Sequence, residues 1–277
     1  MAILLHHETT IRLLSFVSVL LCMALWEWYT PRRNLNLPRS QRWPANLGMV
    51  VVDSLAVRLL IPVLAVGAAV KAVEQGWGLF NLLATPFWLA FVISLLLLDI
   101  AIYAQHVIFH KVPLLWRLHR MHHSDIEIDV STALRFHPLE IILSMLFKVM
   151  LVVLLGIPAE AVLFFEILLN ATAMFNHGNV RIPAQLDRVL RWFLVTPDMH
   201  RVHHSLYREE TDSNFGFNLP WWDYLFGTYR PQPRHGHIGM MIGLGSLRDR
   251  RSQRLFWLLL QPFLPTPVPS QSQDGDL

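Results

Sequence analysis

The sequence predicts an all-α membrane protein with about four transmembrane helices and a helical cap that holds a dimetal histidine site. It also predicts a helical hairpin, whose depth in the membrane stays open. Of its 277 residues, 53% are hydrophobic, and the mean hydropathy is +0.39. Only 16% are charged, against about 25% in an ordinary soluble domain. The same numbers exclude a disordered chain. The third observation is 14 histidines beside a single cysteine.

Five apolar segments are candidates for the predicted helices, because a spanning helix needs about 20 apolar residues. The first ends in Trp26-Glu27-Trp28-Tyr29, which is typical of a membrane interface, and no signal-peptide cleavage site follows it. The last two are separated by Gly156-Ile157-Pro158, which predicts a hairpin turn. The five segments are 11–29, 48–70, 86–108, 138–157 and 159–176.

Charged residues set the expected orientation. Asp53 and Arg58 in the second segment and Lys148 in the fourth indicate that these segments lie partly at the membrane interface or face other helices. The loop 30–47 carries four arginines and no acid, so the positive-inside rule places it in the cytoplasm. Counting spans from there brings every histidine from 106 to 204 to the cytoplasmic face. Segments 109–137 and 178–255 then form the cytoplasmic cap.

The histidines repeat one pattern. His119-Arg120-Met121-His122-His123 and His200-Arg201-Val202-His203-His204 share the spacing HxxHH. Positions i, i+3 and i+4 of a helix share a face, so each pentapeptide can direct three imidazoles to one point. His106 and His110 stand at i and i+4 at the end of the third segment.

Two more histidines, His137 and His177, flank the hairpin. His137 precedes a proline and equally fits a cap of the next helix. Ten histidines suit two metals, and one cysteine leaves only nitrogen or oxygen ligands; imidazole accepts Zn, Cu, Fe or Ni. The candidate ligands are His106, His110, His119, His122, His123, His137, His177, His200, His203 and His204.

Four residues, Asp99, Tyr103, Asn179 and Asp223, are candidates to support those ligands. Asp99, Tyr103, His106 and His110 follow one helix face, and an Asp near the end of an apolar helix needs a partner. A histidine N–H is a natural partner. A metal-bound imidazole usually donates the N–H of its other nitrogen to a carboxylate or carbonyl group. Asn179 and Asp223 are the further candidates.

These motifs resemble the fatty acid hydroxylase/sterol desaturase superfamily of integral-membrane di-iron enzymes. The likeness covers roughly 95–230 and includes the stretches 196–200, 212–216 and 222–228. It implies a hydroxylase/desaturase domain over 91–235, after N-terminal membrane helices in 1–90. Residues 236–277 are expected to form an amphipathic segment, with 254–260 lying on the membrane, and a disordered tail from Pro262.

The resemblance also implies two iron ions as cofactors, with zinc a possible occupant of purified protein, and O₂ as co-substrate. It implies hydroxylation or desaturation of a membrane lipid, with sterol, fatty acyl, alkylglycerol and carotenoid all open. The chain carries no haem-attachment motif, cluster cysteines or dinucleotide fingerprint. A separate electron donor of ferredoxin or cytochrome type is therefore expected. A bacterial inner membrane is the expected location, and no nucleic-acid partner is expected; the oligomeric state stays open.

Two other functions fit the histidines less well. A zinc-dependent membrane hydrolase needs a general base such as the Glu of H-E-x-x-H, and none of the histidine motifs contains one. A metal transporter needs histidines along a path at mid-membrane, whereas these are expected at one face.

Overall fold

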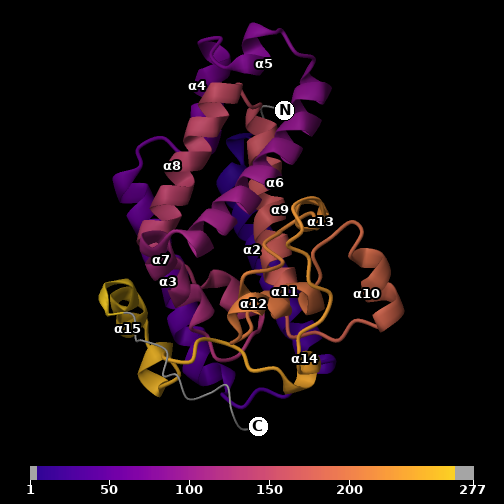
Figure 1. Cartoon of the computed structure of the whole chain (residues 1–277). Coiled ribbons are helices and arrows are strands. Elements are labelled where there is room, and N and C mark those ends of the chain that lie inside the picture. Colours follow the sequence, from indigo (N-terminus) through magenta and orange to yellow (C-terminus); the bar gives the residue numbers. More distant parts are fainter. Residues whose placement is uncertain (1–4, 266–277) are drawn as a thin grey trace.

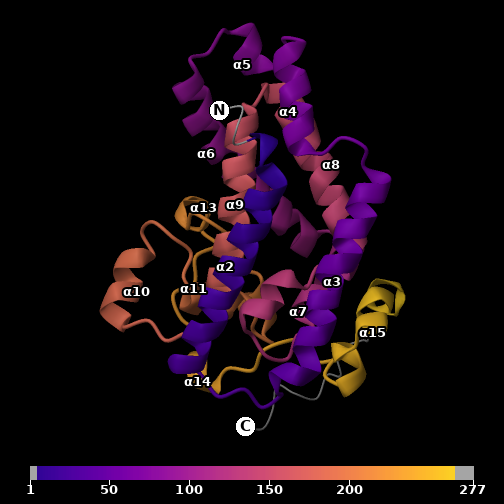
Figure 2. The same ribbon diagram turned by 180° about the vertical axis from the view of Figure 1, so that it is seen from behind.

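The computed structural model describes residues 5–265, and every regular element in that range is helical. Figures 1 and 2 show an elongated bundle of long helices at one end and a cap of shorter helices at the other. The bundle contains α2 (Glu8–Tyr29), α3 (Arg39–Leu60), α4 (Ala65–Glu74), α5 (Leu79–Leu82), α6 (Phe87–Lys111), α8 (Pro138–Leu155) and α9 (Ala159–Asn176).

The cap is built from the segments between and after these helices. Its helices are α7 (Pro113–His123), α10 (Ala184–Leu190), α11 (Pro197–His203), α12 (Arg208–Thr211), α13 (Trp221–Leu225), α14 (Gly236–Gly239) and α15 (Leu255–Leu260). Three short 3₁₀ helices complete it: η1 (Val130–Leu134), η2 (Arg250–Gln253) and η3 (Gln261–Phe263). The N-terminal helices are part of the same packing, since α2 lies against α9 and α3 against α8.

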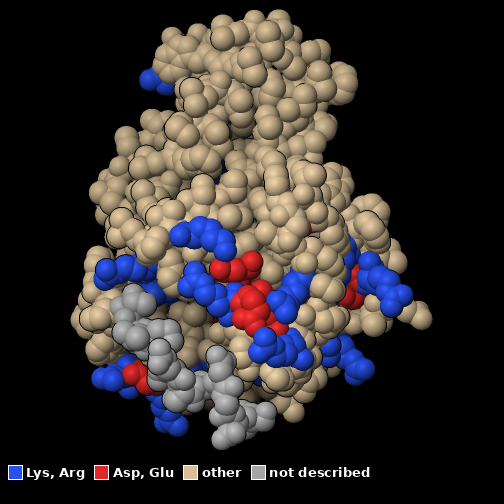
Figure 3. All heavy atoms as spheres, viewed as in Figure 1, with Lys and Arg blue, Asp and Glu red and all other residues tan. Residues whose placement is uncertain are grey.

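The bundle has the length and surface of a membrane domain. Five helical segments are long and apolar enough to cross a bilayer: Glu8–Tyr29, Arg39–Leu82, Phe87–Lys111, Pro138–Leu155 and Ala159–Asn176. Figure 3 shows charged side chains gathered on the cap, while the bundle end is nearly free of them. The chain is therefore an all-helical integral membrane protein, as its composition predicts.

The second predicted segment is not one helix. Residues 48–70 were expected to be continuous, but α3 ends at Leu60 and α4 begins only at Ala65. Pro62 lies in the break; proline lacks the backbone N–H and its ring clashes with the preceding turn. The chain therefore bends inside the bundle, and the prediction of an unbroken helix was wrong.

The predicted hairpin is present. Gly156 ends α8 with φ of +68°, a left-handed conformation that costs glycine little. A Cβ at this position would lie 2.8 Å from the carbonyl oxygen of Trp77. Pro158 then precedes α9. The turn therefore needs glycine both for its backbone angle and for the close approach of the segment before α5.

The C-terminal segment is ordered further than its composition suggests. Pro262 and Leu264 were expected in a disordered tail, but their carbonyl groups accept hydrogen bonds from the side chain of Arg117 (2.7 Å) and of Arg120 (2.7 Å), respectively. Leu258 of α15 is fully buried against the cap side of α3. The rest of the predicted tail, 266–277, lies outside the described residues.

A buried ionic network fastens the cap to the bundle. The guanidinium group of Arg42, on α3, is fully buried and donates to both oxygens of Asp125 at 2.8 and 2.7 Å. It also donates to Asp129 at 2.7 Å and to Thr132 at 3.1 Å. Burial alone would raise the pKa of Asp125, but Arg42 and Arg135 outweigh it and lower that pKa to about 2.

Other arginines of the 30–47 loop are also paired. Arg32 lies 3.0 Å from Asp198, and Arg39 lies 2.8 Å from Glu27. The Arg32 contact joins the loop to α11 of the cap, whereas the Arg39 contact joins the start of α3 to α2 within the bundle. The arginines that predict the orientation therefore have a structural role as well, and the cytoplasmic orientation stays a prediction.

Replacing Arg42 by alanine leaves two buried carboxylates without their cation. Breaking a buried ion pair from one side costs about 3–5 kcal/mol, so Arg42→Ala is expected to lower the free energy of unfolding by that amount. Thermal unfolding in detergent micelles measures it, with Arg58→Ala, exposed on the same helix, as the control. Equal stability of the two variants would show that the network does not hold the cap.

Candidate metal centre

Nine of the ten candidate histidines meet in the cap, directly below the bundle. They form two groups, within each of which the potential ligand nitrogens all lie within 4.8 Å of one another. All nine side chains are buried. The first group is His106, His110, His119, His123 and His203, and the second is His122, His177, His200 and His204. The rings of His123 and His204 stack with centroids 4.7 Å apart, so the groups adjoin.

Each HxxHH pentapeptide divides its histidines between the two groups. In α7, His119 and His123 belong to the first group, and the intervening His122 belongs to the second. In α11 the assignment is reversed: His203 joins the first group, while the second takes the other two. The expectation that each pentapeptide aims at one point is thus wrong. Adjacent positions diverge by about 100° around a helix, which lets one motif serve two centres.

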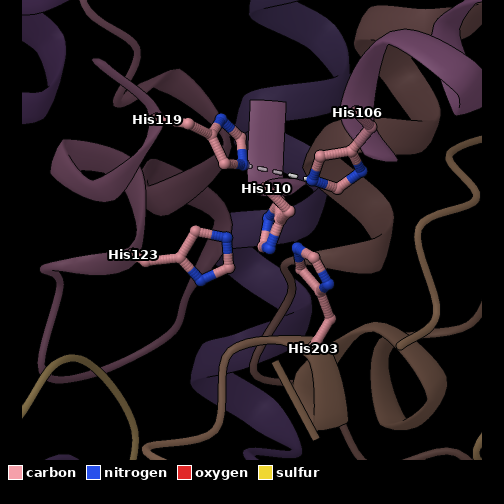
Figure 4. Close-up of side chains that lie close together, drawn as sticks. All are labelled: His106, His110, His119, His123 and His203. Carbon is pink, nitrogen blue, oxygen red and sulfur yellow. Dashed lines mark hydrogen bonds between the residues drawn. The ribbon is translucent and has the colours of Figure 1, made fainter. Parts of the chain in front are cut away.

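The local sequence fixes both helices. Pro113 opens α7, where its missing N–H costs nothing. Thr196 caps α11 by accepting from the backbone N–H of Met199 at 3.3 Å, and Pro197 follows it. His106 and His110 come from the last turns of α6, and His177 directly follows α9. Figure 4 shows the five rings of the first group turned toward a common centre.

Most rings are held from outside through Nδ1. Four of these atoms donate to buried or backbone oxygens: His106 to Phe215 (2.8 Å), His122 to Arg135 (3.2 Å), His177 to Ala173 (2.7 Å) and His203 to Ser213 (2.7 Å). Carboxylates hold two more: Glu140 at 2.7 Å from His119 and Asp212 at 3.3 Å from His110. A ring whose proton is on Nδ1 presents a lone pair at Nε2.

The inward nitrogens therefore need a positive centre. The Nε2 atoms of His106 and His119 lie 3.1 Å apart, and so do those of His122 and His177. In both pairs the Nδ1 atoms are already engaged, so two lone pairs face each other. The Nε2 atoms of His110, His123, His203 and His204 are buried without a partner among the described residues. Such an all-imidazole set fits two transition-metal ions.

Protons are poor substitutes for metal here. Burial lowers the pKa of His119 to about 3, because the charged ring loses its hydration. Burial, reinforced by neighbouring imidazoles, lowers the pKa of the following rings well below the usual value: His122, His123, His200, His203 and His204. The rings are thus neutral at pH 7, which is the form that binds metal.

Aromatic side chains surround the histidines. Phe136 stacks on His122 with centroids 4.5 Å apart. Phe215 packs against His106, His110 and His203 at 5.0–5.5 Å, and Phe217 lies 5.0 Å from His106. These rings thus form an apolar shell around the buried histidines.

His137 lies outside both groups. Its Nδ1 accepts from the backbone N–H of Leu139 at 3.2 Å, and its Nε2 donates to the carbonyl of Leu259 at 3.2 Å. It caps α8 and contacts the C-terminal segment. Both ring nitrogens are engaged, which leaves no lone pair for a metal.

The four supporting candidates form no hydrogen bond with a histidine. Asp99 accepts from Asn218, Leu219 and Trp222 rather than from an imidazole. Tyr103 shares a 2.9 Å hydrogen bond with Thr228. These contacts hold the segment 214–228 against α6.

Of the other two candidates, Asp223 supports a ring indirectly, whereas the contacts of Asn179 lead away from the histidines. Asp223 accepts from the backbone of Phe215 and Gly216 at 2.8 and 2.9 Å, and so fixes the carbonyl that holds His106. Asn179 binds the backbone of Arg33. Burial raises the pKa of Asp223 to about 6, against the lowering effect of those hydrogen bonds.

Sequence reasoning missed the groups that orient the rings. Glu140 holds His119, and Arg135 holds α7 through the Met121 carbonyl at 2.9 Å while its own carbonyl receives His122. A signal was available, since a lone Glu begins the apolar segment 138–157. A buried carboxylate at that point requires a donor.

Comparison with known proteins gives the chain a family. Residues 91–228, half of the chain, match the family described as fatty acid hydroxylase. This segment carries all nine clustered histidines. The chain therefore belongs to the fatty acid hydroxylase family, within the fatty acid hydroxylase/sterol desaturase superfamily. No solved structure gives a significant match.

Curated relatives are named as lipid-oxidising enzymes. The ornithine lipid hydroxylase OlsE of Rhizobium tropici is 31% identical over 150 residues, 54% of this chain and 44% of that protein. The alkylglycerol monooxygenase of Homo sapiens is 31% identical over 163 residues, 57% of this chain and 34% of that protein. A Delta(7)-sterol-C5(6)-desaturase of Nicotiana tabacum is 29% identical over 235 residues, 79% of each. The chain spans less than half the length of the first two.

Glu140→Gln tests the outer support of the first group. The amide no longer stabilises the Nδ1 proton of His119 as a carboxylate does, and loss of such a partner costs about 10–100-fold in metal affinity. Chelator competition on the purified protein is expected to show that weakening. Glu160→Gln, at the distant start of α9, is the matched control. Unchanged affinity in Glu140→Gln would rule out this support.

Proposed function

We propose that the protein is an O₂-dependent lipid oxygenase that hydroxylates or desaturates a C–H bond at a di-iron centre. The observation that carries the proposal is the pair of adjoining, buried, all-imidazole groups. His106, His110, His119, His123 and His203 would hold one iron, and His122, His177, His200 and His204 the other. His137, a ligand candidate by sequence, is not included in the proposed set.

The two irons, when bound, supply the reduction of O₂ that makes an oxidant able to attack an unactivated C–H bond. The protein supplies the rest. Glu140, Asp212 and the backbone acceptors hold six of the nine rings and keep the proton of each on Nδ1. The aromatic shell of Phe136, Phe215 and Phe217 keeps water from the centre and leaves an apolar surface for a hydrocarbon chain.

A membrane lipid is the proposed substrate class. The centre lies at the junction of the cap with the bundle, so a lipid reaches it by moving between spanning helices. The names of three relatives specify an ornithine lipid, an alkylglycerol and a sterol, all of which are lipids. Placement of the reactive carbon decides between hydroxylation and desaturation, and it differs with the lipid.

The cellular setting follows from the same proposal. We place the protein in a bacterial inner membrane with its cap in the cytoplasm, on the strength of the basic loop 30–47. Electrons come from a separate ferredoxin- or cytochrome-type protein, because the chain carries no redox motif other than the histidines. A zinc hydrolase is less well supported, since Glu140 lies behind His119 and not on its Nε2 side.

His122→Ala and His203→Ala remove one proposed ligand from each group. Each is expected to abolish the lipid product. The loss should exceed the about 100-fold effect that removing a hydrogen-bond partner of a ligand produces at most. Lipid profiling of an expressing strain against each variant strain measures the product. Metal analysis of the purified variants is expected to show less iron than in the unaltered protein.

His137→Ala is the matched control for these variants. It removes a buried histidine of the same cap but no proposed ligand, so the iron content is expected to stay at two per chain. Unchanged lipid product and iron content in His122→Ala and His203→Ala would overturn the proposed function. Loss of iron in His137→Ala alone would overturn the proposed ligand set.

A further inference from the structure

Two partly exposed side chains, Asp212 and Trp116, contact the first histidine group. Among the groups that hydrogen-bond the nine rings, Asp212 is the only one that is not buried in the described part of the chain, with 18% of its side chain exposed. The half-buried ring of Trp116 packs against the same group, with its centroid 4.9 Å from that of His110 and 5.3 Å from that of His123. Asp212 and Trp116 thus each link the protein surface to a ring of the first group by direct contact.

Basic side chains surround this point. Lys111 and Arg208 approach Asp212 at 2.9 and 3.4 Å, with 54% and 73% of their side chains exposed. Arg234, 52% exposed, pairs with Glu209. We call the exposed group the α12 patch; it comprises Lys111, Arg208, Glu209, Asp212, Arg230 and Arg234. Its cations outnumber its acids, and Figure 3 shows them around a smaller acidic area.

The proposed reaction requires electrons to enter at some surface. Hydroxylation takes two electrons from the C–H bond and two from a donor, with two protons, to give the alcohol and water from O₂. The chain has one cysteine, Cys22 on α2, and no haem-attachment or cluster motif. Electron transfer slows as the distance between redox centres grows. A donor protein is therefore best placed where partly exposed side chains contact the histidine group.

Resting on the proposed function, we propose that the α12 patch is the docking surface for an acidic one-electron carrier protein. Asp212 and Trp116 then form the contact between that carrier and the first histidine group. A basic surface steers an acidic partner and speeds its encounter, and a small patch suits a transient redox complex. A second copy of this chain would bring like charges together at the same place.

Charge reversal within the patch tests the docking. The double variant Arg208→Glu/Arg234→Glu alters cations that contact no histidine. Arg188→Glu/Arg250→Glu is the matched control, with the same charge change on exposed residues of α10 and η2. The probe is an acidic plant-type [2Fe–2S] ferredoxin, and its Kd for the protein in nanodiscs is measured over a range of salt concentrations.

The unaltered protein is expected to bind the ferredoxin more weakly as salt rises. The patch variant is expected to raise the Kd about 10-fold at low salt, and the control variant to change it less than about twofold. The proposal is overturned if the unaltered protein shows no salt-dependent binding, or if both variants weaken it equally. Self-association that the patch variant abolishes would instead assign the surface to a second copy.

Replacement of Trp116 tests the contact itself. Trp116→Leu is expected to slow reduction of the bound metal by saturating ferredoxin with an unchanged Kd, whereas Trp116→Phe retains a ring and most of the rate. Reduction by dithionite, a small molecule, needs no docking and serves as the reference. Equal ferredoxin rates in all three proteins would remove Trp116 from the route.

These measurements separate the two proposals. Ferredoxin binding is measured without reference to metal or turnover, so it stands or fails by itself. Absence of iron from the unaltered protein would contradict the proposed function, even if the patch binds ferredoxin. Iron that dithionite reduces normally, with no effect of the patch on ferredoxin binding, would contradict only the docking surface.

Discussion

The structure depends on one constraint: nine neutral imidazoles are buried in a small volume with their lone pairs turned inward. Nε2 atoms at 3.1 Å whose Nδ1 atoms are already engaged repel each other unless a cation lies among them. Burial makes ring protonation costly, and the other groups that contact the rings hold them from outside. Metal binding is therefore coupled to the packing of the cap, and the outer hydrogen bonds determine where six of the nine rings point.

The cap stays in place through polar contacts that the bundle supplies. Arg42 reaches from α3 to Asp125, two residues after His123. Arg135, just before the hairpin, donates to the Met121 carbonyl of α7, and Glu140, in the first turn of α8, holds His119. A histidine site built only from cap residues would lack these anchors. The spanning helices thus do more than admit a lipid, because they also position the ligands against it.

Much of this arrangement could be predicted from the sequence, and the exceptions have physical causes. Hydropathy identifies the bundle, and Gly156 identifies the hairpin. The two HxxHH motifs, the His106–His110 pair and His177 together identify the nine histidines that do meet. The break at Pro62 went unseen because the apolar run continues through it. The division of each pentapeptide between two groups depends on neighbouring helices, which a local spacing does not describe. His137 illustrates the limit most clearly: its motif fits a ligand and a cap equally, and only the position of Leu139 and Leu259 decides.

The most direct test of the central claim is the metal content of the purified, unaltered protein, with each variant of the two groups beside it. The account predicts two iron ions per chain, and a loss of iron on replacing either His122 or His203. It also predicts that His137→Ala keeps both ions. A protein that folds with no metal, or that retains full iron when His122 and His203 are replaced together, would contradict it.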